Sequence, residues 1–97
     1  GVATPTEAFA AIKAGADGLK LFPAQMISPA AVKALRAVLP TETILLPVGG
    51  ITPGQLADYF AAGASGFGLG SELFKPSYPF DEIRQRAMDF VSAARRP

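Results

Sequence analysis

The chain repeats itself, and this repeat limits the folds that it can adopt more than any other feature. Residues 1–22 align without gaps with residues 49–70. The aligned segments share glycines, a Thr-Pro pair and an Ala-Gly-Ala step: Gly1 with Gly49, Thr4-Pro5 with Thr52-Pro53, Ala14-Gly15-Ala16 with Ala62-Gly63-Ala64, Gly18 with Gly66, and Leu21 with Leu69. Repetition at this scale indicates structural units that pack against one another.

Helix signals alternate with short apolar strand signals along the chain. Capping residues and apolar spacing predict four helices, at about residues 4–14, 28–40, 52–63 and 81–95. Apolar β-rich runs predict strands between them, within residues 18–22, 43–50 and 65–70. Short connections between helices and strands in this order predict a parallel sheet built from βαβ units.

Two architectures fit this alternation. Four βα units, the first lacking most of its strand, correspond to half of a (β/α)8 barrel of the TIM-barrel type, which typically needs about 250 residues. A doubly wound sheet is the competing architecture. We favour the barrel because of the repeat, so that residues 1–97 form about half of one barrel domain. The chain starts with Gly1 directly before a helix, and we expect it to be a piece of a longer protein.

Composition argues against several classes of function. Nine basic and eight acidic residues give a net charge of +1, which provides no basic surface for nucleic acid. Histidine and cysteine are absent, so we expect no metal site, no thiol chemistry and no cofactor, in keeping with a reducing cytoplasm. No apolar run reaches the roughly 18–20 residues that a membrane span requires, so we expect no membrane partner.

A single lysine, Lys20, interrupts the apolar segment GLKLFPAQ of residues 18–25. Side chains alternate along a strand, so Lys20 and Phe22 share one face while Leu19 and Leu21 share the other. In a barrel, Lys20 and Phe22 then point inward near the C-terminal end of the strand, where barrel enzymes hold their sites. We expect a partly desolvated amine there, suited to Schiff-base attack on a ketone. A lysine with a buried stem and a solvated head explains the position equally well.

Two glycine loops follow the next two predicted strands. Gly49-Gly50 precedes the helix that is capped at Thr52, and Gly70-Ser71 follows the last strand. Both pairs therefore lie at strand C-terminal ends, where backbone N–H groups and a hydroxyl can bind phosphate. Barrels frequently build a phosphate site from the loops after strands 7 and 8. Turn formation alone also favours glycine, so the two interpretations stand side by side.

Four segments together resemble one enzyme family: GVATPTEA, GLKLFPA, PVGGITP and GLGSELF. They are similar in order and spacing to the C-terminal half of the class I aldolases that act on 2-keto-3-deoxy-6-phosphogluconate (KDPG) and 2-dehydro-3-deoxy-6-phosphogalactonate (KDPGal). The resemblance covers nearly the whole chain. It implies a (β/α)8 barrel, commonly a homotrimer, that needs no metal and acts on a phosphorylated keto-deoxy sugar acid.

The resemblance also assigns roles to residues. It implies that Lys20 forms the Schiff base and that Phe22 packs beside the pyruvate moiety. The residues that would bind the substrate phosphate are Gly49, Gly50, Gly70 and Ser71. KDPG-type enzymes typically carry threonine before the Gly-Gly pair, whereas the KDPGal branch resembles the valine found here as Val48. We therefore favour cleavage of the phosphogalactonate substrate to pyruvate and glyceraldehyde 3-phosphate, with the phosphogluconate substrate as the alternative.

Part of the family's site has no counterpart in this chain. The proton-shuttling glutamate and the carboxylate-binding arginine belong to the N-terminal half, and no residue here matches their motifs. We expect the isolated piece not to turn over substrate. A non-catalytic half-barrel that binds phosphate, or that pairs with a partner through its open sheet edges, is the alternative of a different class.

Overall fold

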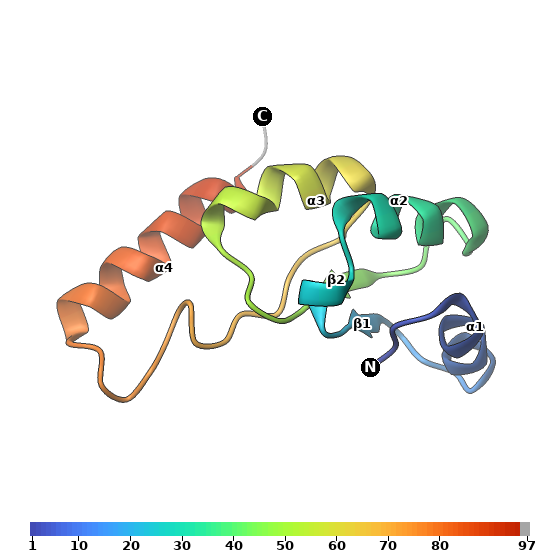
Figure 1. Cartoon of the computed structure of the whole chain (residues 1–97), viewed down its shortest axis with the longest axis horizontal. Helices are drawn as coiled ribbons and strands as arrows, with labels where there is room; N and C mark the ends of the chain where they lie inside the picture. Colours follow the sequence, from blue (N-terminus) through green and yellow to red (C-terminus); the bar gives the residue numbers. More distant parts are fainter. Residues whose placement is uncertain (96–97) are drawn as a thin grey trace.

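The computed structural model describes residues 1–95 as helices arranged around short parallel strands (Figure 1). In chain order the elements are α1 (Pro5–Lys13), β1 (Leu19–Leu21), η1 (Ala24–Met26), α2 (Pro29–Val38), β2 (Leu45–Pro47), η2 (Pro53–Gln55), α3 (Leu56–Ala62) and α4 (Phe80–Ala94). α1 and α4 lie at opposite ends of the molecule. All four predicted helices are present, whereas the 3-10 turn η1 was not predicted. None of the helices in the described part is long and apolar enough to cross a membrane.

Side-chain caps fix where the first two long helices begin. The Thr4 hydroxyl accepts a hydrogen bond from the Glu7 N–H at 3.2 Å, and the Glu7 carboxylate accepts one from the Ala3 N–H at 3.1 Å. Ser28 caps α2 by accepting from the Ala31 N–H at 3.2 Å. These contacts satisfy N–H groups that the helix itself leaves open. Thr4 and Ser28, at which two of the predicted helices begin, therefore act as N-caps.

The sheet runs in chain order and is entirely parallel. β1 pairs with β2, with Lys20 opposite Leu46. Single parallel bridges extend it on both sides, from Val2 to Leu21 and from Val48 to Gly68. A doubly wound sheet instead reverses its strand order at a switch point, and no reversal occurs among the described strands. The α/β class is confirmed, in a piece that carries few strands.

The strand predicted within residues 65–70 is reduced to one bridge at Gly68. Its hydrogen bonds reach one neighbour: the Ser65 N–H donates to Leu45 and the Gly68 N–H to Pro47. Glycines at 66, 68 and 70 also leave it with few side chains to pack on a pleated surface. The segment follows the sheet without forming a full strand.

Helices cover one face of the sheet and leave the other face open. Leu19, Leu21 and Leu45 point toward the helices and are at most 2% exposed. Tyr59 of α3 is 4% exposed, and its hydroxyl donates to the Ile27 carbonyl at 2.6 Å. This buried bond ties α3 to the segment that follows η1, so the helical layer holds the ends of the strands in place.

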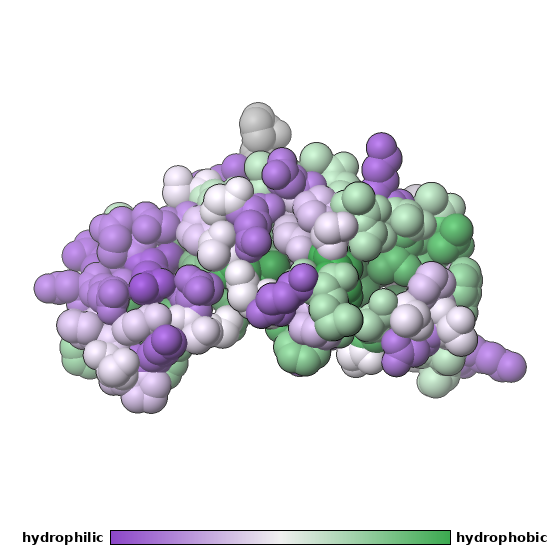
Figure 2. Space-filling view, in the orientation of Figure 1, coloured by the Kyte–Doolittle hydropathy of each residue, from purple (hydrophilic) through white to green (hydrophobic). Residues whose placement is uncertain are grey.

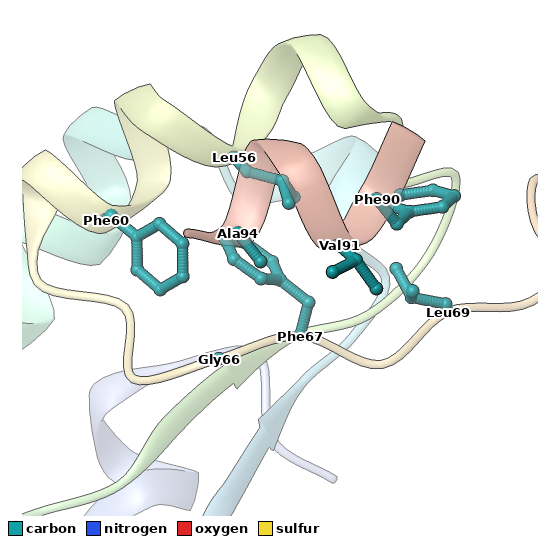
Figure 3. A pocket seen from close by; sticks show the side chains of 8 residues that line it. All are labelled: Leu56, Phe60, Gly66, Phe67, Leu69, Phe90, Val91 and Ala94. Carbon is teal, nitrogen blue, oxygen red and sulfur yellow. The ribbon is translucent and has the colours of Figure 1, made fainter. Parts of the chain in front are cut away.

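The apolar core extends between α3, α4 and residues 66–69 (Figure 3). The Phe60 and Phe67 rings meet edge to face, with their centroids 5.0 Å apart. Phe90 of α4 is 4% exposed and lies with Val91 in the same region. The lining is almost wholly apolar and belongs to the helix side of the sheet. We interpret it as packing that holds α4, because it presents no group for chemistry.

Apolar and charged surface are separated along the molecule. Figure 2 shows hydrophilic residues gathered over α4 and apolar residues toward the α2 end. At that end a groove between α1 and α2 contains Phe9, Met26 and Val38, which are 47%, 79% and 56% exposed. These side chains place a continuous apolar surface on the outside of the helical layer.

Candidate active site

Lys20 lies on the open face of β1, as strand alternation predicts. Its side chain is exposed while those of Leu19 and Leu21 are buried. The Lys20 Nζ lies 4.6 Å from the centroid of the Phe22 ring, and Phe22 is 48% exposed. An ammonium at this distance is attracted by the ring face. The two residues therefore share a face and contact each other at the C-terminal end of the strand.

The expected desolvation of the lysine amine is not found in this chain. Lys20 is exposed, because no element in residues 1–95 covers its face of the sheet. The prediction of a desolvated amine assumed that Lys20 points into the interior of a closed barrel. Direction follows from the local backbone, whereas closure requires further strands.

Two glycines make room for apolar side chains on this same face. A Cβ at Gly68 would lie 2.5 Å from the Val48 Cγ2 atom, and one at Gly66 would lie 3.3 Å from the Leu46 Cδ2 atom. Any side chain at position 68 would force Val48 to move. Val48 thus lies at the end of its strand, packed over the glycine backbone of the neighbouring segment. Sequence reasoning missed these glycines, although their alternate spacing in a strand was the available signal.

The Gly49-Gly50 loop adopts a backbone that favours glycine. The φ angles of Gly49 and Gly50 are +123° and +63°. A Cβ at Gly49 would lie 2.5 Å from the Gln25 Oε1 atom and 3.0 Å from the Ala24 nitrogen. The Ala24 N–H also donates to the Val48 carbonyl at 2.8 Å, which joins the end of β2 to η1. Both backbone conformation and crowding therefore exclude larger residues here.

The backbone N–H groups of the two glycine loops are open. Within residues 1–95, the N–H groups of Gly49, Gly50, Gly70 and Ser71 donate to no protein acceptor. All four follow the carboxyl ends of neighbouring parallel segments, one and two places from β1. Open N–H groups in glycine turns form concave sites for anions. The structure thus brings all the predicted site residues to one edge of the sheet.

The loop that carries Ser71 is fastened to α4. The Tyr78 hydroxyl donates to the Ser71 carbonyl at 2.8 Å. Arg86 of α4 donates to the Glu72 carbonyl at 2.8 Å, and its guanidinium lies 4.4 Å from the centroid of the Tyr78 ring. Charged donors to a backbone carbonyl make strong hydrogen bonds. These contacts hold residues 71–78 in a folded loop, although the segment contains no helix or strand.

Fold and site together define a class of protein: a parallel βα-repeat chain with a strand lysine and two open glycine turns at the carboxyl edge of its sheet. Barrel enzymes keep their functional groups at this edge. A comparison with protein families then gives the narrower assignment. The model of the KDPG and KHG aldolase family matches residues 1–89, and the chain belongs to this family. The resemblance inferred from the four sequence segments is confirmed.

Two curated relatives match nearly the whole chain. One, from Rhizobium meliloti, is named a probable 2-dehydro-3-deoxy-6-phosphogalactonate aldolase and is 50% identical over 93 residues, covering 96% of this chain and 44% of the relative. The 2-dehydro-3-deoxy-6-phosphogalactonate aldolase of Escherichia coli is 46% identical over 95 residues, covering 98% of this chain and 46% of the relative. The chain therefore spans less than half the length of either relative.

Solved structures agree with this family assignment. A native KDPGal structure superposes with a TM-score of 0.91 at 46% identity, over 95% of this chain and 45% of that chain. A cube-shaped porous protein cage, designed by fusing symmetric oligomeric domains, gives 0.90 at 46% identity, over 95% of this chain and 34% of that chain. The arrangement of helices and strands in residues 1–95 therefore recurs within longer chains.

Proposed function

We propose that this chain is the C-terminal half of a (β/α)8 class I aldolase that cleaves 2-dehydro-3-deoxy-6-phosphogalactonate to pyruvate and glyceraldehyde 3-phosphate. The observation that carries the proposal is the single lysine on the open sheet face, beside two turns with open N–H groups. The names of both curated relatives support the substrate. Cleavage of KDPG is the alternative for the same machinery.

Lys20 is the proposed nucleophile. Its free amine attacks the C2 carbonyl of the keto acid, and loss of water gives an iminium. A base then removes the proton of the C4 hydroxyl, the bond between C3 and C4 breaks, its electron pair moves into the iminium to form an enamine, and the aldehyde product leaves. Protonation of the enamine and hydrolysis of the imine release pyruvate and restore the amine. The glutamate and arginine that the family resemblance implies for proton transfer and carboxylate binding come from the other half.

The remaining site residues have distinct proposed roles. Phe22 contacts the Lys20 side chain and provides an apolar wall beside the pyruvate moiety. The open N–H groups at Gly49, Gly50, Gly70 and Ser71 bind the phosphate. The segment that leads to Ser71 lies two strand spacings, about 10 Å, from β1. A ligand that is bound both at Lys20 and at the turn with Ser71 must be elongated. This suits a six-carbon acid with its phosphate at the end opposite the ketone.

Val48 is the proposed residue for substrate preference. It lies on the open face at the end of β2 and offers a methyl surface where a threonine would offer a hydroxyl. The two epimeric substrates differ at one stereocentre, so one hydroxyl contact of about 1 kcal/mol can shift the preference without making it exclusive.

Assembly and location complete the proposal. We propose a homotrimer in the cytoplasm. The exposed apolar groove with Phe9, Met26 and Val38 supports the assembly, as does the similarity to a cage built from symmetric oligomeric domains. Side chains this apolar and this exposed are typical of surfaces that another chain covers.

Trapping of the imine tests the function. The full-length protein is incubated with pyruvate and borohydride, which reduces an imine to a stable secondary amine, and the adduct is located by peptide mass mapping. We expect a pyruvyl adduct on Lys20, none in Lys20→Met, and a normal yield in Lys33→Met, which removes an exposed lysine of α2. An adduct elsewhere, or normal turnover by Lys20→Met, would refute the proposal.

A further inference from the structure

Within residues 1–95, the groups assigned so far to the proposed phosphate site carry no positive charge. Its four backbone N–H groups are neutral donors, whereas a phosphate monoester carries about −1.5 to −2 charges at pH 7. Charge-assisted hydrogen bonds are roughly twice as strong as neutral ones, and lysine and arginine are the usual cationic partners of phosphate. A cation at the carboxyl edge of the sheet would therefore complete the site.

Most cations in residues 1–95 already have polar partners or belong to helices outside the glycine loops. Arg36 donates to the carbonyls of Thr43 and Gly63, each at 2.6 Å. Arg86 pairs with Glu72 and Glu82 at 3.7 and 3.5 Å. The cations that belong to helices or their ends, and not to the glycine loops, are Lys13, Lys33, Arg84 and Arg95. Lys20 attacks the ketone in the proposed reaction, so we do not assign it to the phosphate.

Lys75 is the cation that remains. It belongs to the same folded loop as Gly70-Ser71, and its ammonium forms no ion pair with the described residues. Its Nζ lies 5.8 Å from the centroid of the Tyr78 ring. The hydroxyl of that ring donates to the Ser71 carbonyl at 2.8 Å. A chain of two contacts thus runs from Lys75 through Tyr78 to Ser71, whose N–H is open.

The backbone of the loop keeps this arrangement compact. The Leu73 and Phe74 N–H groups both donate to the Gly70 carbonyl, at 2.9 and 3.0 Å. The Tyr78 N–H donates to the Lys75 carbonyl at 3.0 Å. Two successive turns therefore fold the loop, and Lys75 follows the first turn and begins the second along the chain. The flexible four-carbon stem of lysine gives the ammonium a range of positions around this loop.

The geometry points to Lys75 as the residue that neutralises the phosphate group of the substrate, with Tyr78 as the residue that positions it. This inference rests on the proposed aldolase function and adds a binding residue to it. Its ligand class is a phosphate monoester at the end of the substrate remote from the ketone. Lys75 has no part in the bond-breaking step.

Steady-state kinetics of the full-length enzyme test the inference. Lys75→Gln keeps a polar side chain and removes the charge, so we expect KM for the phosphorylated substrate to rise about tenfold to a hundredfold, with kcat within about twofold. Lys75→Arg should restore most of the binding. Tyr78→Phe, which removes the hydrogen bond to Ser71, should raise KM about threefold. Lys33→Gln, a matched loss of an exposed lysine on α2, should leave KM unchanged.

Two further readouts separate phosphate binding from a general structural role. Inhibition by inorganic phosphate should weaken in Lys75→Gln in proportion to the rise in KM, and added salt should raise KM less than in the wild type. Imine trapping with pyruvate should proceed at Lys20 in the variant, because pyruvate carries no phosphate. An unchanged KM in Lys75→Gln, or an equal loss of pyruvate trapping, would overturn the role of Lys75. Absence of a pyruvate adduct in the wild type would instead overturn the aldolase proposal itself.

Discussion

Gly49→Ala is the perturbation whose effect the structure defines most fully. The φ angle of Gly49 is +123°, a conformation that residues with a side chain rarely adopt. The new Cβ would also lie 2.5 Å from the Gln25 Oε1 atom and 3.0 Å from the Ala24 nitrogen. Gln25 is exposed and can rotate away, whereas the Ala24 backbone cannot move without breaking its hydrogen bond to Val48.

The cost follows from these two contributions. A left-handed backbone costs a residue with a side chain about 1–2 kcal/mol. Overpacking against fixed backbone adds about 1–3 kcal/mol. We expect Gly49→Ala to lower the free energy of unfolding by about 2–5 kcal/mol, a large part of the roughly 5–15 kcal/mol typical of a domain. The loop can avoid part of this cost by shifting, which would displace its open N–H groups and raise KM for the phosphorylated substrate by about tenfold or more.

Urea unfolding and steady-state kinetics of the full-length enzyme measure both effects. Gly54→Ala is the matched control, because a Cβ at Gly54 meets nothing within 4 Å and its backbone is not left-handed. The control should keep its stability within the range of ordinary surface substitutions, about 0.5 kcal/mol. If Gly49→Ala matched Gly54→Ala in both urea midpoint and KM, the loop geometry inferred for Gly49 would be wrong.

Further predictions concern the scaffold behind the site. Tyr59→Phe should cost about 1–3 kcal/mol, because the Ile27 carbonyl loses a buried donor, and urea unfolding measures this loss. Burial raises the pKa of Tyr59 above its ordinary 10.0, so the contribution of Tyr59 to folding stability is complete below pH 10 and is lost as pH rises through the folded-state pKa. The free energy of unfolding should therefore depend less on pH above 10 in Tyr59→Phe than in the wild type. Equal slopes of stability against pH would contradict this. Arg36→Met should cost about 3 kcal/mol by removing charged donors to Thr43 and Gly63, whereas Lys33→Met should change the urea midpoint little.

Local chemistry made the helix starts and the direction of the Lys20 side chain predictable. Thr4 and Ser28 cap helices because their hydroxyls bond to N–H groups three residues away, and this depends only on neighbouring residues. The alternation of Leu19, Lys20 and Leu21 assigned the two faces of β1 before any tertiary contact was known. Such features follow from spacing along the chain, which is why sequence reasoning found them.

Features that depend on distant contacts were missed. The segment at 65–70 has the apolar composition of a strand, yet it has one neighbouring strand and forms a single β-bridge, at Gly68. The need for glycine at that position arises from Val48, twenty residues earlier in the chain. Arg36 bonds to the Gly63 carbonyl across a similar separation. No local pattern encodes these pairings, because each depends on which segments the fold brings together.

Lys20 combines one property that neighbouring residues determine with one that distant contacts determine. Its direction depends on the backbone of β1 and was predicted, whereas its solvation depends on what covers the open face, and the sequence left a desolvated and a solvated amine equally open. Both curated relatives are more than twice as long as the matched segment, and in the proposed barrel the additional strands would enclose this face. Enclosure would exclude water from the site and hold the keto acid against the lysine. Imine trapping should therefore be slower on this chain alone than on the full-length protein, because the lysine belongs to this half while its reactivity depends on both.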